Sequence, residues 1–214
     1  MKLVDLTVRE FVSEVDSASP APGGGSVSAV AASLGSGLLR MIGHLTIPKK
    51  KFKTLEEDIQ QEYINIHESL KGYETKLLDL VDRDTDAFND IMRAFKMPKE
   101  TDTEKKKRKQ AIEQATLKAI EIPEQIASIA YEALKKVDFV RLYGNKNALS
   151  DVGVGALMLY AGLEGACLNV KINLPGLEDA SIKTHYTEKV EAMLHDAKTI
   201  KDNLLKAIHE SLAA

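Results

Sequence analysis

The chain has 214 residues, of which 44% are apolar and 29% are charged, and its formal net charge is −3. The length favours one domain spanning residues 1–214, and the apolar fraction is too high for a disordered chain. The slightly acidic balance argues against nucleic acid as a general partner.

Periodic apolar residues predict six helices in chain order. They cover residues 7–17, 26–47, 54–96, 103–137, 150–173 and 179–214. Thr7 with Glu10 and Thr54 with Glu57 have the spacing of capping boxes, which marks the starts of the first and third helices. Pro123 removes one backbone donor and is expected to bend the fourth helix.

The fold class that follows is all-α. No short run of Val, Ile and Thr alternates with period two, so we expect no sheet, and no repeated pattern indicates a helical solenoid. A single-domain bundle of long helices remains. Residues 138–147 are expected to form a loop between two of its helices.

The glycines gather in two segments, with 11 of the 13 lying in residues 23–43 or 144–165. Glycine lowers helicity, so its clustering suggests close contact of the backbone with a neighbouring helix, a partner subunit or a ligand. The apolar runs 26–39 and 152–163 are shorter than the roughly 18 residues of a membrane-spanning helix. They are also more apolar than one small bundle needs. We therefore expect a homodimer and no membrane partner.

Asp84 is the candidate catalytic residue. It lies on a seam of apolar side chains along the third helix, whereas Asp82 and Asp86 are expected to face away. Burial raises the pKa of a carboxyl group toward the range that a general acid or base needs. The alternative is a buried carboxylate satisfied by a backbone cap or a lysine. The other seam residues are Ile59, Tyr63, Ile66, Leu70, Leu77, Val81, Phe88, Ile91 and Phe95.

A glycine turn before the second helix is a candidate binding site. It consists of Gly23, Gly24 and Gly25, followed by Ser26. The free N–H groups at a helix start can face an anion or a developing oxyanion. The alternative is a tight turn between crossed helices. No strand precedes the turn, so it matches no nucleotide-binding motif.

Polar residues also gather before the helix at 150–173. They are Asn145, Asn147, Ser150 and Asp151. One Asn or Ser suffices as an N-cap, and Asp151 suits the positive end of the helix dipole. The remaining groups are either available to a polar ligand or serve only as caps.

The remaining chemistry-bearing residues are few. Lys49 and Lys50 could attract an acidic ligand, while the basic run 105–109 is expected to be solvated surface. Five histidines without Glu-x-x-His spacing and the single Cys167 predict no metal site. One cysteine cannot form an internal disulfide, and the start of the chain lacks an apolar signal segment, so we expect a cytoplasmic protein.

Four motifs in register resemble the cyclodeaminase/cyclohydrolase domain of the formiminotransferase-cyclodeaminase family. They are Pro22-Gly23-Gly24-Gly25-Ser26, Leu45-Thr46 with Lys49-Lys50, Val81-Asp82-Arg83-Asp84-x-x-Ala87-Phe88, and Gly144-Asn145-x-Asn147-x-x-Ser150-Asp151. The similarity continues through Met97-Pro98 and the segment 169–174, in matching order and spacing. A formiminotransferase domain is absent from this sequence.

The resemblance implies an all-helical subunit that dimerises and holds a tetrahydrofolate derivative, which can be polyglutamylated, at the subunit interface. It maps an essential aspartate onto Asp84. It also implies that the glycine-turn amides with Asn145 or Asn147 hold the pterin and amide groups, and that Lys49 and Lys50 pair with glutamate carboxylates. No cofactor beyond the folate substrate is expected.

The activity implied by the resemblance is closure of 5-formimidoyltetrahydrofolate to 5,10-methenyltetrahydrofolate with release of ammonia. Some relatives instead hydrate methenyltetrahydrofolate to 10-formyltetrahydrofolate. The sequence leaves both open, together with a third interpretation, a non-catalytic helical dimerisation module.

Overall fold

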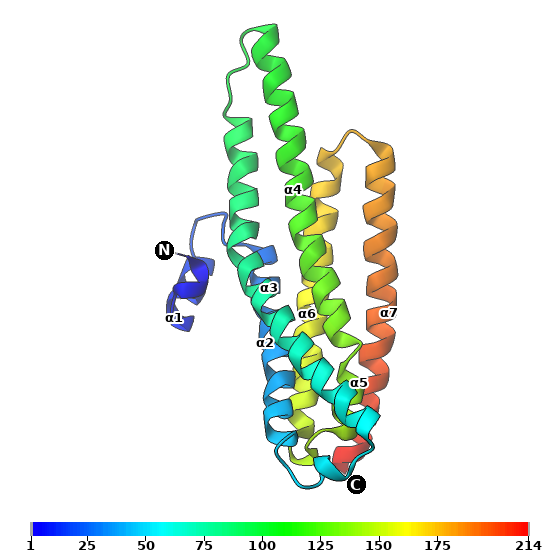
Figure 1. Ribbon diagram of the computed structural model, residues 1–214. Coiled ribbons are helices and arrows are strands. Elements are labelled where there is room, and N and C mark those ends of the chain that lie inside the picture. Colours follow the sequence, from blue (N-terminus) through cyan, green and yellow to red (C-terminus); the bar gives the residue numbers. More distant parts are fainter. Residues whose placement is uncertain (1, 214) are drawn as a thin grey trace.

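The computed structural model describes residues 2–213. Within that range the chain forms seven α-helices and four 3₁₀ turns and no strand, which confirms the all-α prediction (Figure 1). The helices are α1 (Val8–Val15), α2 (Gly24–Thr46), α3 (Glu57–Phe95), α4 (Asp102–Leu134), α5 (Val137–Tyr143), α6 (Leu149–Asn173) and α7 (Ala180–Ala213).

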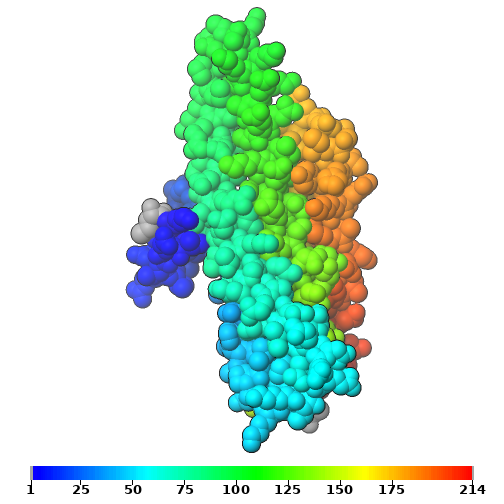
Figure 2. All heavy atoms as spheres, viewed as in Figure 1, coloured from blue at the N-terminus to red at the C-terminus, as the bar shows by residue number. Residues whose placement is uncertain are grey.

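The long helices pack around one hydrophobic core. Helix α2 contacts α3 and α6, α4 contacts α3 and α6, and α7 covers the outer side of α4 and α6. The tip of the α3–α4 hairpin projects beyond the other helices (Figure 1). Helix α1 stands out from the side of the bundle, as the space-filling view shows (Figure 2).

Close contact between α2 and α6 explains much of the glycine clustering. A Cβ atom on Gly35 would lie 2.8 Å from the carbonyl oxygen of Gly155, and one on Gly162 would lie 2.6 Å from that of Ser28. Two backbones approach this closely only where side chains are missing. The sequence left open whether the glycines contact a neighbouring helix, a partner subunit or a ligand. For Gly35 and Gly162 the contact is with a neighbouring helix.

The prediction that residues 138–147 form a loop is wrong for most of its length. Helix α5 occupies Val137–Tyr143. Val137 and Val140 are buried on its inner face, and Asp138 forms an ion pair with Arg141 one turn away. Tertiary burial of two apolar residues therefore stabilises a helix that is too short to show a clear period in the sequence.

Of the two predicted capping boxes, one is confirmed and the other is wrong. Thr7 and Glu10 make both reciprocal hydrogen bonds at the start of α1. Thr54 instead ends a 3₁₀ turn and donates to the carbonyl oxygen of Lys51, while Glu56 is the N-cap of α3. The preceding loop thus determines where α3 begins.

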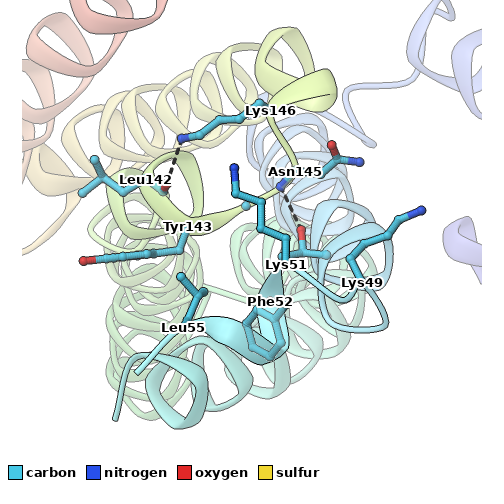
Figure 3. A pocket seen from close by; sticks show the side chains of 10 residues that line it. Lys49, Lys51, Phe52, Leu55, Leu142, Tyr143, Asn145 and Lys146 are labelled. Carbon is cyan, nitrogen blue, oxygen red and sulfur yellow. Dashed lines mark hydrogen bonds between the residues drawn. The ribbon is translucent and has the colours of Figure 1, made fainter. Parts of the chain in front are cut away.

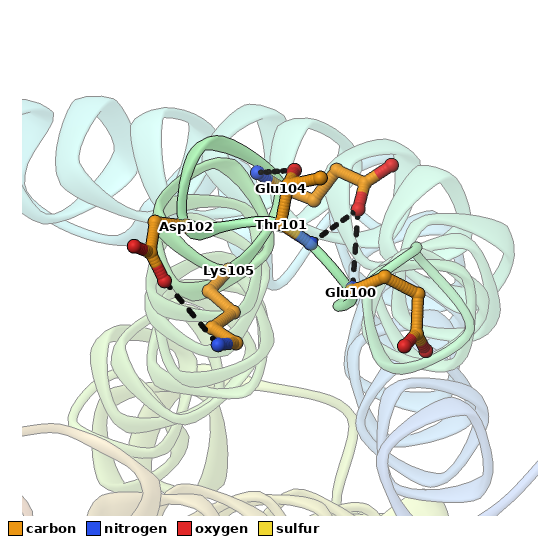
Figure 4. A network of polar contacts seen from close by, with 5 residues as sticks. All are labelled: Glu100, Thr101, Asp102, Glu104 and Lys105. Carbon is orange, nitrogen blue, oxygen red and sulfur yellow. Dashed lines mark hydrogen bonds and ion pairs between the residues drawn. The ribbon is translucent and has the colours of Figure 1, made fainter.

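A capping box also starts α4 at the hairpin tip (Figure 4). The Thr101 side chain accepts from the Glu104 backbone N–H, and the Glu104 carboxylate accepts from the backbone N–H groups of Thr101 and Glu100. Asp102 forms an ion pair with Lys105 on the same turn. These local bonds stabilise the first turn of α4 at the hairpin tip.

The central helices are longer than the apolar runs that predicted them. Helix α2 has 23 residues, and α6 with its flanking 3₁₀ turns spans residues 146–176. Each has the length and mean hydropathy of a membrane span, but 56% and 50% of their most apolar windows lie inside the bundle. Much of this hydropathy therefore serves the core.

Eight large apolar side chains of these two helices are exposed, and we refer to them together as the α2–α6 face. It consists of Val27, Leu34, Met41 and Leu45 on α2 and of Val154, Leu157, Leu168 and Ile172 on α6. The α2 members recur at intervals of four or seven residues, which places them on one side of that helix. Exposed apolar residues that gather on one side of a helix are typical of an interaction site.

Candidate active site

Most of the predicted apolar seam on α3 faces the core, and Asp84 lies on it. Asp84 is partly buried, and Asp86 is exposed as expected. Asp82 differs from the prediction, because it is partly buried and accepts a 2.6 Å hydrogen bond from the backbone N–H of Leu3. The seam also ends early, since Phe95 is 49% exposed.

The glycine turn meets Asp84 at the start of α2. The Ser26 backbone N–H donates to Asp84 Oδ2 over 2.8 Å, and the Ser26 hydroxyl lies 3.2 Å from the same oxygen. Ser26 is the third residue of α2, so Asp84 caps this helix from a different helix and lies at the positive end of its dipole. One alternative considered from the sequence was a buried carboxylate satisfied by a backbone cap, and this holds for Oδ2 of Asp84.

Gly25 makes this approach possible. A Cβ atom at position 25 would lie 2.1 Å from Asp84 Oδ1 and 2.4 Å from its carboxyl carbon. These separations are far shorter than van der Waals contact. Any side chain here would displace the carboxyl group, so the glycine turn is part of the geometry that positions Asp84.

The environment of Asp84 favours its protonated form. Burial raises the pKa of its carboxyl group above the ordinary value, and the hydrogen bonds from Ser26 oppose this rise without cancelling it. Among residues 2–213, no lysine or arginine forms an ion pair with Asp84. A carboxyl group with a raised pKa is a better proton donor than an exposed aspartate, which is the property that a general acid needs.

Asp84 opens into a cleft of about 290 Å³ between α2, α3, α4 and α6. Phe88, Ile91 and Ala119 form apolar walls beside the carboxyl group. The glycine turn and the end of α6 close the other sides. The remaining lining residues are Pro20, Ala21, Gly23, Gly24, Asn169, Ile172 and Asn173.

Asn169 and Asn173 are cleft residues that the sequence did not single out as a site. The Asn169 side-chain N–H donates to the Gly165 carbonyl, and that of Asn173 donates to the carbonyls of Ala119 and Asn169. These bonds orient both amides and leave their carbonyl oxygens as acceptors. Their spacing of four residues, one turn of a helix, was the available signal.

A second group of predicted residues lies at the other end of α2. Lys49 and Asn145 line a hollow of about 210 Å³, together with Lys51 and Lys146 (Figure 3). The backbone N–H of Asn145 donates to Thr46 Oγ1 over 2.9 Å, which ties the two loops together. Three lysines from two segments thus surround one hollow.

Lys146 gives this hollow a fixed cation. Its Nζ donates to the carbonyl oxygens of Arg141 and Leu142 at the end of α5, over 2.9 and 2.8 Å. Burial lowers the pKa of Lys146, and Arg141 and Lys51 lower it further through charge repulsion. An anionic ligand would relieve this repulsion, so the hollow is suited to a carboxylate or phosphate.

Four predicted residues do not line this hollow. The Asn145 side chain accepts from the backbone N–H of Asn147 and caps a short 3₁₀ turn. Lys50, Asn147 and Ser150 are exposed, and Asp151 is partly buried in the first turn of α6. The local geometry gives the pair of asparagines a capping role.

The two groups cannot surround one small ligand within a single chain. Asp84 lies at the first turn of α2 and Lys49 follows its last turn, and a helix of 23 residues is about 34 Å long. The candidate site residues of the sequence motifs therefore form two separate groups within one subunit, one at each end of α2. We call them the glycine end and the lysine end of α2.

No group of three or more His, Cys, Asp and Glu side chains with the geometry of a metal site occurs in residues 2–213. Cys167 is buried, and burial raises the pKa of its thiol to about 11, so it stays protonated. Of the described residues that line the cleft, Asp84 is the one with an ionisable side chain, and it is therefore the candidate group for proton transfer there.

The fold and the cleft define a helical-bundle protein with a capped carboxyl group poised for acid–base chemistry. The chain matches the formiminotransferase-cyclodeaminase family over residues 7–192. It belongs to that family, which confirms the resemblance stated from the motifs.

Comparison with individual proteins supports this assignment. The chain is 32% identical to methenyltetrahydrofolate cyclohydrolase of Methylorubrum extorquens, covering 94% of this chain and 95% of that protein. It is 36% identical to formimidoyltransferase-cyclodeaminase of Gallus gallus over 92% of this chain, but spans only 36% of that longer relative. The crystal structure of formiminotetrahydrofolate cyclodeaminase from Thermotoga maritima superposes with a TM-score of 0.84 at 25% identity, covering 98% of each chain.

Proposed function

We propose that this chain is a folate one-carbon enzyme, a 5-formimidoyltetrahydrofolate cyclodeaminase that uses Asp84 as its acid and base. The observation that carries the proposal is the Asp84 carboxyl group, held by Ser26 at the start of α2 and open to an apolar cleft. Family membership supports the choice of substrate, because the names of both aligned cyclodeaminases specify formimino chemistry.

The chemistry needs one group that gives and takes protons at neighbouring nitrogens. Protonated Asp84 donates to the imino nitrogen, and N10 adds to the formimidoyl carbon to form a tetrahedral centre. The carboxylate then accepts the N10 proton and delivers it to the amino group, which leaves as ammonia and gives the methenyl cation. Water restores the proton to Asp84, so the reaction consumes one proton in total. The raised pKa of Asp84 favours the first step.

Hydrolysis of 5,10-methenyltetrahydrofolate is the second candidate. The aligned cyclohydrolase matches almost end to end, whereas the chicken enzyme contains much additional chain. In this reaction the Asp84 carboxylate takes a proton from the attacking water. It returns that proton to N5 as the C–N5 bond breaks, and the carbinol hydroxyl then loses its proton to solvent to give the formyl group. Both reactions pass through a tetrahedral carbon beside the same carboxyl group.

Two assays with the purified chain test the proposal. Release of ammonia from 5-formimidoyltetrahydrofolate, with appearance of the methenyl chromophore, is the expected result. Loss of that chromophore from 5,10-methenyltetrahydrofolate without ammonia would assign the hydrolase instead. If the protein neither binds nor converts either folate, both proposed activities are contradicted. The interpretation that then remains is a non-catalytic helical dimerisation module.

We further propose that the active site is shared between two copies in a homodimer. The exposed α2–α6 face supplies the apolar surface for association. A two-fold axis perpendicular to α2 would place the lysine end of one subunit beside the glycine end of the other. The folate could then contact Asp84 of one copy and the Lys49–Lys51 loop of its partner.

Mixing two inactive or weakened variants tests the shared site. Asp84→Asn damages the glycine end, and Lys49→Gln with Lys51→Gln damages the lysine end. The lysine variant is expected to be impaired in KM and not in kcat, so activity is compared as kcat/KM at substrate concentrations well below KM. In randomly mixed dimers, half the molecules are hybrids, and each hybrid regains one of its two sites, so about a quarter of the wild-type kcat/KM should return. Activity no higher than the average of the separate variants would show that each site lies within one chain.

We also propose that the enzyme acts in the cytoplasm. Its single cysteine is a buried thiol, and the pKa of about 11 keeps it protonated and unreactive. Such a chain needs no oxidising compartment to fold. Recovery of its activity from a membrane or extracellular fraction of the source cells would contradict this location.

A further inference from the structure

A buried proline lies in the interior of α4, one helical turn from the wall of the Asp84 cleft. The helix continues through this residue, Pro123. Proline has no backbone N–H, so the carbonyl oxygen of Ala119, four residues earlier, has no donor at its usual position in the helix. Ala119 is itself buried. Because a buried carbonyl oxygen without a donor is costly, this oxygen needs a partner from outside α4.

Asn173 supplies the missing donor from α6. Its side-chain amide nitrogen donates to the Ala119 carbonyl oxygen over 3.1 Å and to the Asn169 carbonyl oxygen, one turn earlier on α6, over 2.9 Å. Both partners are carbonyl oxygens, which can only accept hydrogen bonds, so the amide nitrogen of Asn173 must face them. The side-chain oxygen, Oδ1, must then point away from both.

The free oxygen of this amide is available to a ligand in the cleft. Asn173 and Ala119 both line the cleft, and Asn173 is only partly buried. Among residues 2–213, no group donates a hydrogen bond to Asn173 Oδ1, and this oxygen is not one of the buried polar atoms. The hydrogen bond across α4 and α6 therefore holds a hydrogen-bond acceptor in a fixed orientation in the same cleft as Asp84.

We propose that Pro123 is a positioning residue of the active site that acts through Asn173, whose Oδ1 accepts a hydrogen bond from an N–H group of the substrate. The inference rests on the proposed function, in which the cleft holds a reduced pterin with several N–H donors. Without the proline, the backbone N–H of residue 123 would bond to the Ala119 carbonyl and compete with the Asn173 amide. The amide could then rotate, and its oxygen would no longer be held toward the substrate.

A positioning role and a purely structural role for Pro123 predict different signs. A proline inside a helix lowers stability, because it removes a hydrogen bond and crowds the preceding turn. If Pro123 positions Asn173, replacement by Ala should raise stability and lower activity. If the fold instead depends on the proline, the same replacement should lower both. The sign of the change in stability therefore separates the two roles.

The experiment is a double-mutant cycle of Pro123→Ala and Asn173→Ala, in which kcat/KM is measured with the folate that the wild type converts. Each single variant should lose about three- to tenfold in kcat/KM, which is the effect of one hydrogen bond. The double variant should be no worse than Asn173→Ala, because Pro123 acts through that side chain. Pro98→Ala is the matched control. This proline is exposed in the loop between α3 and α4, so its replacement should leave kcat/KM unchanged.

Thermal unfolding of the same variants tests the hydrogen bond without any turnover. Pro123→Ala should raise Tm in the wild-type background. It should raise Tm further in the Asn173→Ala background, because there the Ala119 carbonyl has lost the Asn173 donor and gains most from a new backbone N–H. If Asn173→Ala does not fold, Asn173→Ser takes its place in the cycle, since a serine hydroxyl can still donate to the Asn169 carbonyl.

Other results would overturn the proposal. One is unchanged kcat/KM in Asn173→Ala, and another is a loss in the double variant equal to the product of the two single losses. A fall in both Tm and kcat/KM in Pro123→Ala would give the proline a structural role instead. Absence of turnover in the wild type would contradict the proposed function, and with it the substrate contact. The Tm cycle would still decide whether Pro123 and Asn173 are coupled, so the two failures are distinguishable.

Discussion

The two ends of α2 have opposite chemical character although they belong to one continuous helix. At the glycine end, backbone N–H groups and a carboxyl group meet in a largely apolar cleft, and none of the described residues that line it is a lysine or an arginine. At the lysine end, three lysines surround a hollow that is open to solvent. Proton transfer benefits from the first environment, because desolvation raises the pKa of a carboxylic acid. Capture of an anion benefits from the second.

If the proposed roles hold, substrate binding and proton transfer are separated by the length of α2. If a second copy brings the two ends together, each environment can be built without compromising the other. A lysine beside Asp84 would lower the pKa of the carboxyl group and oppose its role as an acid. Four predictions test this separation, from the largest expected effect to the smallest.

Replacement of Asp84 by Asn should reduce kcat about 10²–10⁴-fold, because it removes general acid–base catalysis but keeps a hydrogen-bond acceptor for Ser26. Steady-state turnover and circular dichroism on the same preparation measure activity and fold. Near-normal kcat in a folded variant would show that Asp84 does not transfer the proton, and the glycine end would then not be the place of the chemistry.

Replacement of Gly25 by Ala should reduce kcat about 10²-fold, since the added Cβ would displace the Asp84 carboxyl group. Overpacking at this contact should also cost about 1–3 kcal/mol of unfolding free energy. Gly37 is the matched control on the same helix, because a Cβ there meets no atom within 4 Å. Gly37→Ala should leave kcat intact and raise stability by about 0.5–1 kcal/mol. Kinetics and urea unfolding of both variants distinguish the two positions.

Replacement of Lys49 and Lys51 by Gln should raise KM about three- to tenfold and leave kcat nearly unchanged, because these residues would bind the substrate without taking part in proton transfer. The KM effect should shrink as ionic strength rises. A large fall in kcat, similar to that of Asp84→Asn, would mean that the two ends do not have separate roles.

The smallest expected effect concerns the pH dependence of stability. Because the pKa of Asp84 is raised in the folded state, the folded protein binds more protons at this site than the unfolded chain, and stability falls as pH rises from the ordinary Asp value through the raised one. Asp84→Asn should therefore have a higher Tm than the wild type at pH 7.5, and this difference should vanish near pH 4. A lower Tm for the variant at pH 7.5 would indicate that the charged carboxylate stabilises the fold.

Several site features followed from the sequence because they depend on neighbours along one helix. The seam on α3 isolated Asp84, and glycine clustering indicated close approach of α2 and α6. Asn169 and Asn173 escaped notice as site residues, because their partners belong to α4 and to their own helix, and only packing brings them to the cleft. Helix α5 was missed for a related reason, since seven residues show too little periodicity and depend on burial against the core.

The sequence by itself determined the all-helical class, the apolar faces and the position of Asp84 on an apolar seam, since these rest on helical periodicity and on the free-energy cost of placing a carboxylate among apolar side chains. Only the tertiary structure decided that the predicted ligand-binding residues form two groups at opposite ends of α2. Distances between helices depend on how their surfaces pack, and the order of residues along the chain does not specify those distances.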